Sequence, residues 1–142
     1  MSGILKLFTV LAVLLVTTAA TVHAQTEVIN IPFNFNVGNK TLPAGEYVAR
    51  RNRTDSDAIW LLQSKDSHLT ALFISTAVQA SKTQNKTKLI FNKYGSQHFL
   101  SQIWINGNNS GRELVMQRQE RELRKTVVAR QLVLSIGVAA KD

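Results

Sequence analysis

The stretch that decides the fold class is Val28-Ile29-Asn30-Ile31-Pro32-Phe33-Asn34-Phe35-Asn36-Val37. Apolar side chains occupy every odd position from 29 to 37, and asparagine or proline occupies the even positions from 30 to 36. Because successive side chains of a β-strand point to opposite faces, this alternation predicts a strand with one buried face. Pro32 has no N–H to donate to a neighbouring strand, so we expect an edge strand or a bulge at that residue.

Similar apolar stretches recur along the chain and are separated by turn signals. In Leu42-Pro43-Ala44-Gly45 the placement of Pro43 and Gly45 is the residue pattern of a type I turn. This spacing predicts a mainly β fold with about seven antiparallel strands, arranged as a small barrel or sandwich. The other six expected strands cover residues 46–51, 58–63, 69–78, 87–93, 99–106 and 131–138. We expect one buried core that includes Phe33, Phe35, Leu72, Ile74, Phe91, Ile103, Leu134 and Ile136.

The pattern changes after residue 109. Ser110 and Glu113 have the spacing of a capping box, in which a serine cap is followed three residues later by a glutamate. Residues 112–125 contain no proline, glycine or aromatic residue and are rich in Arg, Glu, Gln and Leu. We therefore expect a helix over about 112–125, and its weak apolar stripe predicts a place on the surface.

The first 24 residues have the organisation of a signal peptide. Lys6 precedes an apolar run over residues 7–16, and the following stretch turns small and polar before it ends at Ala24. This predicts cleavage between Ala24 and Gln25, because a permanent spanning helix needs about 20 apolar residues. We expect residues 1–24 to be a signal peptide and 25–142 a single β-rich domain in the periplasm or outside the cell, with no transmembrane segment after cleavage.

Composition limits the function classes. The chain has 142 residues, of which 44% are apolar, and it contains no cysteine, so it can build one core but no disulfide framework or thiolate metal site. Residues 25–142 offer only His68 and His98 as histidines, and no HxH, HxxxH, HExxH, GxGxxG or GxxxxGK[ST] spacing occurs. We therefore expect no metal and no cofactor, and we do not expect an enzyme.

Basic residues dominate the charge. The formal net charge is +8, which implies attraction to polyanions. The candidate anionic contacts are Arg118, Arg121, Arg124 and Lys125, on the expected helix. Export would take the chain away from nucleic acid, so the partner would be an acidic polymer or a phosphate-bearing glycolipid of the envelope. A merely solvated basic face is the other interpretation, and the oligomeric state stays open.

These features are compatible with two functions. The first is an exported, non-enzymatic β-domain that contacts envelope components or anionic polymers. The alternative is a small β-barrel that carries an apolar ligand, which would require a cavity inside the barrel.

Several short motifs resemble a known group of proteins. They are Pro32-Phe33-Asn34-Phe35, Val37-Gly38, Leu42-Pro43-Ala44-Gly45-Glu46-Tyr47, Tyr94-Gly95, Phe99-Leu100, Ile103-Trp104, Gly107, Gly111-Arg112-Glu113-Leu114 and Glu120-Arg121-Glu122-Leu123. Together they resemble an uncharacterised family of short exported proteins of Acidobacteria-type bacteria. The chain departs from the pattern at Val115-Met116-Gln117, where such proteins often continue with Pro-Lys-Ser. The resemblance implies export and the β fold, and no activity.

Overall fold

The computed structural model describes residues 27–52 and 56–136, which form ten β-strands and one α-helix. The helix α2 (Arg118–Thr126) lies between the last two strands in the chain. The prediction of a mainly β fold is confirmed. The strands are β1 (Ile29–Ile31), β2 (Phe35–Val37), β3 (Lys40–Leu42), β4 (Gly45–Arg51), β5 (Ile59–Ser64), β6 (Thr70–Gln79), β7 (Thr87–Tyr94), β8 (Gln97–Trp104), β9 (Ser110–Leu114) and β10 (Arg130–Ile136).

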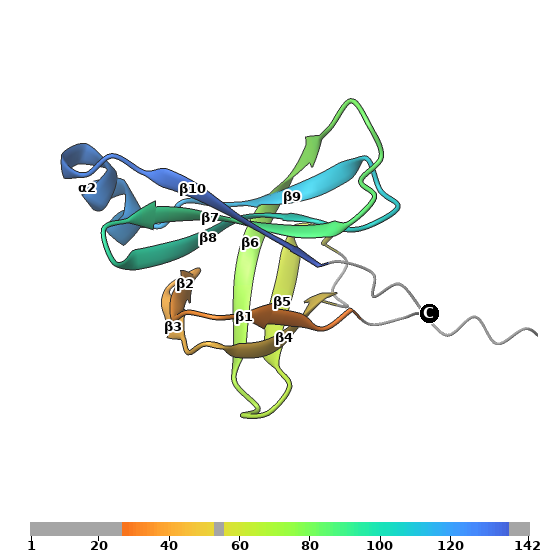
Figure 1. The fold of residues 1–142 in the computed structure, drawn as a ribbon, viewed down its shortest axis with the longest axis horizontal. Coiled ribbons are helices and arrows are strands. Elements are labelled where there is room, and N and C mark those ends of the chain that lie inside the picture. The colour runs from red at the N-terminus through yellow and green to blue at the C-terminus, as the bar shows by residue number, and fades with distance from the viewer. Residues whose placement is uncertain (1–26, 53–55, 137–142) are drawn as a thin grey trace, which may run out of the picture.

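The strands form one sheet that folds over into two layers (Figure 1). One layer has the order β1-β4-β5-β6, and the other contains β9, β8, β7 and β10, with the β2–β3 hairpin beside β8. The long strand β6 belongs to both layers, because its first half pairs with β5 and its second half with β9. Neighbours are antiparallel except β2 and β8. Within the described residues β1, β3 and β10 each pair on one side only, so the sheet is not closed.

The stretch that was expected to form one strand is divided in two. β1 pairs with β4, whereas β2 pairs with β3 and β8, so the chain crosses from one layer to the other between residues 32 and 34. Pro32 cannot donate to a ladder, and the side-chain Oδ1 of Asn34 accepts a hydrogen bond from the N–H of Ala44 at 3.0 Å. This division, the extra strand β3 and the strand β9 account for ten strands where about seven were expected.

The core lies between the two layers and contains the alternating side chains of β1 and β2. Phe35 contacts Tyr47 and Phe91 edge-to-face, with ring centroids 5.2 and 5.7 Å apart. The Tyr47 hydroxyl donates to the carbonyl of Pro43, and burial raises the pKa of Tyr47. Of the expected core residues, Phe35, Phe91 and Ile103 are buried. Phe33, Leu134 and Ile136 are partly buried and pack against the core.

Two expected core residues lie on the wrong face of β6. Leu72 is 57% exposed and Ile74 is 60% exposed, whereas Ala71 and Phe73 point into the core. A shift of one residue reverses every side chain of a strand. Because Leu72, Phe73 and Ile74 are all apolar, the sequence does not indicate which parity is buried, and the prediction chose the outer one.

The predicted start of the helix is also wrong. Ser110 and Glu113 lie in β9, which pairs with β6 on one side and with β8 on the other. The capping box therefore does not form. The helix begins eight residues after Ser110, and its N-cap Gln117 makes no side-chain cap hydrogen bond. β9 pairs with β6 over five residues and with β8 over three, so the tertiary context overrides the local capping pattern.

Candidate anion-binding surface

One side of helix α2 is held on the sheet by a glutamate. Glu120 is only 5% exposed, and its Oε1 accepts hydrogen bonds from Asn92 Nδ2 at 2.9 Å and from the Tyr94 hydroxyl at 3.0 Å. Burial, followed by the hydrogen bond and the charge of Glu120, raises the pKa of Tyr94. The glutamate thus fixes which face of α2 meets the outer surface of β7, and which face meets solvent.

Three of the four predicted basic contacts share the solvent face of α2. An α-helix has about 3.6 residues per turn, so Arg118, Arg121 and Lys125 lie above one another, turned away from Glu120. All three are exposed. The guanidinium of Arg121 donates to the carbonyl of Met116 at 2.6 Å. Lys125 forms an ion pair with Glu122 at 3.0 Å, so one of the three cations is already partly neutralised.

The fourth predicted contact, Arg124, points elsewhere. It follows Glu120 by one turn and lines a polar cleft of about 480 Å³ between α2 and the outer face of the sheet. Tyr94 lines the same cleft, and the charge of Arg124 lowers the pKa of Tyr94. Arg124 therefore belongs to the inner flank of the helix rather than to its solvent face.

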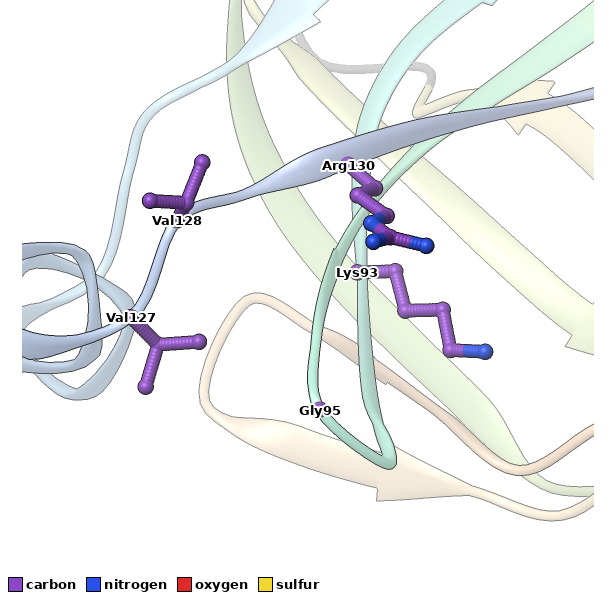
Figure 2. Close-up of a pocket in the computed structure, with 5 residues that line it drawn as sticks. All are labelled: Lys93, Gly95, Val127, Val128 and Arg130. Atoms are coloured by element: carbon purple, nitrogen blue, oxygen red, sulfur yellow. The ribbon is translucent and has the colours of Figure 1, made fainter.

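A pair of cations that the sequence interpretation did not bring together lies beside the end of α2. Arg130 in β10 is the direct cross-strand partner of Lys93 in β7, and both are exposed. Figure 2 shows their side chains extending in the same direction from neighbouring strands. They line a hollow of about 460 Å³ together with Gly95, Val127 and Val128. No carboxylate lies among these lining residues, and neither cation forms an ion pair with another described residue.

His98 extends this row by one strand. It is the cross-strand partner of Lys93 in β8, and its ring stacks on Phe33 with centroids 4.0 Å apart. Burial, with a further contribution from the positive charge of Lys93, lowers the pKa of His98. Arg130, Lys93 and His98 thus form a row across three strands. Lys93 and Arg130 lie on the face of the sheet opposite to Asn92 and Tyr94, the residues that hold α2. We name the solvent face of α2 (Arg118, Arg121, Lys125) together with Lys93 and Arg130, at the end of the helix, the basic surface.

The remaining predicted site residues fall outside this surface. Pro43 lies in the two-residue connection between β3 and β4, and Gly45 begins β4. His68 lies in the connection between β5 and β6, with a φ of 54°. The cleavage site at Ala24 and Gln25 lies outside the described residues. Among residues 27–52 and 56–136 there is no group of three His, Cys, Asp or Glu side chains that could hold a metal ion.

Comparison of the chain with protein-family models, with curated proteins and with solved structures gives no match. The resemblance to short exported bacterial proteins therefore stays a prediction. Over the described part of the chain, no helix has the length and apolar character needed to cross a membrane.

Proposed function

We propose that this chain is an exported, non-enzymatic β-domain that binds an anionic polymer of the cell envelope through the basic surface. The observation that carries the proposal is the cross-strand pair Lys93–Arg130. Like charges directly opposite one another weaken a strand pair. An anionic group bound in the hollow between them would offset that repulsion, since guanidinium and ammonium groups both donate to carboxylate and phosphate oxygens.

The magnitude of each contact favours a polymer over a single small anion. Exposed charge pairs contribute about 0–1 kcal/mol each, so Lys93 and Arg130 alone would hold one anion weakly. Val127 and Val128, which directly follow α2, line the hollow. A chain of repeated negative charges that passes around the end of α2 would meet both groups of cations, and binding at linked sites multiplies affinity.

The expected export limits the chemistry of the partner. Acidic polysaccharide and phosphate-bearing glycolipid are the polyanions of an envelope, and nucleic acid is not expected there. The alternative of an apolar ligand carried inside the barrel has less support, because buried Phe35 contacts Tyr47 and Phe91 edge-to-face between the two layers.

Salt elution from an immobilised polyuronate tests this proposal. The double variant Lys93→Gln/Arg130→Gln should elute at clearly lower salt than the parent chain. The matched control, Lys82→Gln/Lys86→Gln, removes the same two charges from the exposed connection between β6 and β7 and should elute close to the parent. Retention of the parent should vanish at about 1 M salt, where the screening length is only about 3 Å.

Two outcomes would contradict the proposal. If both double variants lost retention equally, net charge alone would explain binding and the cross-strand pair would have no special role. If the parent chain were not retained at low salt, the basic surface would be a solvated face without a polyanionic partner.

A further inference from the structure

A group of exposed aliphatic side chains lies on the outer face of the other layer. Leu72 and Ile74 are 57% and 60% exposed, and Val115 is 47% exposed. Cross-strand pairing joins Leu72 to Leu61, and Ile74 to Ile59. The N–H of Val115 donates to the carbonyl of Ile74 at 3.0 Å, so Val115 continues the group. We name these five residues the aliphatic patch.

The aliphatic patch includes a shallow hollow. Its volume is about 320 Å³, and it lies where the β2–β3 turn meets the unpaired edge of the first half of β6. The backbone approaches closely there, since a Cβ added at Gly38 would lie 3.1 Å from the carbonyl oxygen of Leu72. The described lining residues are Gly38, Asn39, Ile59, Leu72, Phe73, Ile74 and Gln117, none of which is charged.

Three cations and one carboxylate, that of the exposed Glu113, lie beside the aliphatic patch. Arg50 is the cross-strand partner of Leu61, in the same row as Leu72, and it is exposed. Lys40 Nζ donates to the carbonyl of Thr70, two residues before Leu72 in β6, at 2.9 Å. The guanidinium of Arg121 lies on the carbonyl of Met116, the residue after Val115. We name Lys40, Arg50 and Arg121 the basic rim, of which Arg121 also belongs to the basic surface.

We infer that the aliphatic patch and its basic rim dock on the surface of a membrane that contains anionic lipid. Exposed contiguous apolar surface with a polar rim marks an interaction site. Aliphatic side chains that enter the acyl boundary, combined with cations at the headgroups, give the binding pattern of peripheral membrane proteins. This surface lies on a different layer from the Lys93–Arg130 pair, so the inference goes beyond polymer binding.

The positive charge of the basic rim argues against a second copy of this chain as the partner that covers the aliphatic patch. Two copies that met face to face would place Lys40, Arg50 and Arg121 of one against the same cations of the other. The chain as a whole also carries a formal charge of +8. Like-charge juxtaposition at an interface opposes association, whereas an anionic bilayer is attracted by both features.

Cosedimentation with lipid vesicles tests the inference. The parent chain should bind vesicles of phosphatidylglycerol and phosphatidylcholine, and bind pure phosphatidylcholine at least ten-fold more weakly. Leu72→Thr/Ile74→Thr should reduce binding to the anionic vesicles about ten-fold, while threonine preserves strand propensity. The control Val128→Thr/Val133→Thr removes two exposed aliphatic side chains elsewhere and should bind like the parent. All forms are compared with the same N-terminus, so residues 7–16 contribute equally.

The rim is tested separately. Lys40→Gln/Arg50→Gln should weaken binding to anionic vesicles at low salt, with Lys82→Gln/Lys86→Gln as the control. The threonine double variant should keep its retention on polyuronate, which separates this surface from the polymer-binding one. Since the chain has no cysteine, Ile74→Cys carries a single environment-sensitive dye, whose emission should shift to the blue on anionic vesicles. The same dye at Val133→Cys should not shift.

Three results would overturn the inference. One is equal binding of the parent to neutral and anionic vesicles, or no binding to either. Another is an equal loss in the Val128→Thr/Val133→Thr control. The third is a threonine double variant that binds vesicles normally but changes from dimer to monomer in sedimentation velocity, which would assign the aliphatic patch to a second copy of the chain.

Discussion

The buried carboxylate of Glu120 determines which face of helix α2 is exposed to solvent. The helix has nine residues, and isolated helices shorter than about 12 residues are marginal in water. Its apolar stripe is weak, with Leu123 only partly buried. The hydrogen bonds from Asn92 and Tyr94 to Glu120 therefore contribute much of what holds α2 on the sheet, and they aim its cations at solvent.

Glu120→Ala should lower the free energy of unfolding by about 1–3 kcal/mol, because the Asn92 and Tyr94 donors lose their buried acceptor. Glu120→Gln keeps an acceptor oxygen and should cost less than alanine. Urea denaturation measures both. The control Glu122→Ala breaks the exposed pair with Lys125 and should change stability by less than about 1 kcal/mol. Equal effects at Glu120 and Glu122 would show that the helix is not anchored by the buried carboxylate.

The lowered pKa of His98 predicts a dependence of stability on pH. Above the ordinary histidine pKa of about 6.5 the ring is neutral in both folded and unfolded chains. As the pH falls below that value, the unfolded chain takes up the proton first, so the folded state loses stability until the folded pKa is passed. The melting temperature should therefore fall from pH 7 toward pH 5.

His98→Asn should flatten this part of the pH profile, and His68→Asn, at an exposed turn position, should leave the slope unchanged. Thermal unfolding of the two variants over the same pH range decides the point. A slope that persists in His98→Asn would assign the pH dependence to other groups.

At the scale of elements, the sequence predicts which residues are apolar more readily than which strand they join. The alternation of Ile29, Ile31, Phe35 and Val37 correctly predicts their burial, because parity is preserved across the bend at Phe33. It does not show that the chain changes layers there. Similarly, the cations of α2 are evident from composition, whereas the Lys93–Arg130 pair depends on a strand register that no local pattern contains.

Strand β9 is a second element whose pairing the local sequence pattern does not predict. Ser110 and Glu113 have capping-box spacing, yet the segment becomes a strand between β6 and β8. In β9 the backbone at Gly111 lies close to the neighbouring strand β8. A Cβ added at Gly111 would lie 2.6 Å from Trp104 Cδ2 and 2.9 Å from the carbonyl oxygen of Ile103. Glycine is thus required by packing at this position rather than by helix entry.

Gly111→Ala should destabilise the fold by about 1–3 kcal/mol, the usual cost of overpacking, since the added methyl group meets both a ring and a backbone oxygen. Ser110→Ala, one residue earlier and exposed, should cost less than about 0.5 kcal/mol, whereas a helix cap would cost about 0.5–2 kcal/mol. Chemical denaturation of the two variants compares them directly. A larger loss of stability in Ser110→Ala than in Gly111→Ala would support the capping box and contradict strand β9.

At the scale of the whole molecule, the fold separates two surfaces of different character. The long strand β6 carries the aliphatic patch on its first half and turns into the layer of β9 with its second half. Mainly β structure was predictable because turn signals and alternation are local. The sequence did not predict which apolar side chains of β6 remain outside the core, since residues of both parities are apolar around Leu72. The aliphatic patch therefore emerges only from the pairing of strands.

The last prediction concerns the solvent face of α2. Arg118→Gln/Arg121→Gln/Lys125→Gln should leave the melting temperature nearly unchanged, because the exposed Lys125–Glu122 pair contributes only about 0–1 kcal/mol. The same triple variant should elute from polyuronate at lower salt. Adding Lys93→Gln/Arg130→Gln should abolish retention, since both groups of cations that hold the polymer are then removed.

Arg124→Gln is the matched control, because this residue belongs to the same helix but lines the cleft beside Glu120. It should reduce retention less than Arg118→Gln does. Equal effects of these single changes would mean that the polymer responds to total charge and not to the face that Glu120 directs outward. An unchanged elution of the triple variant would confine polymer binding to the Lys93–Arg130 hollow.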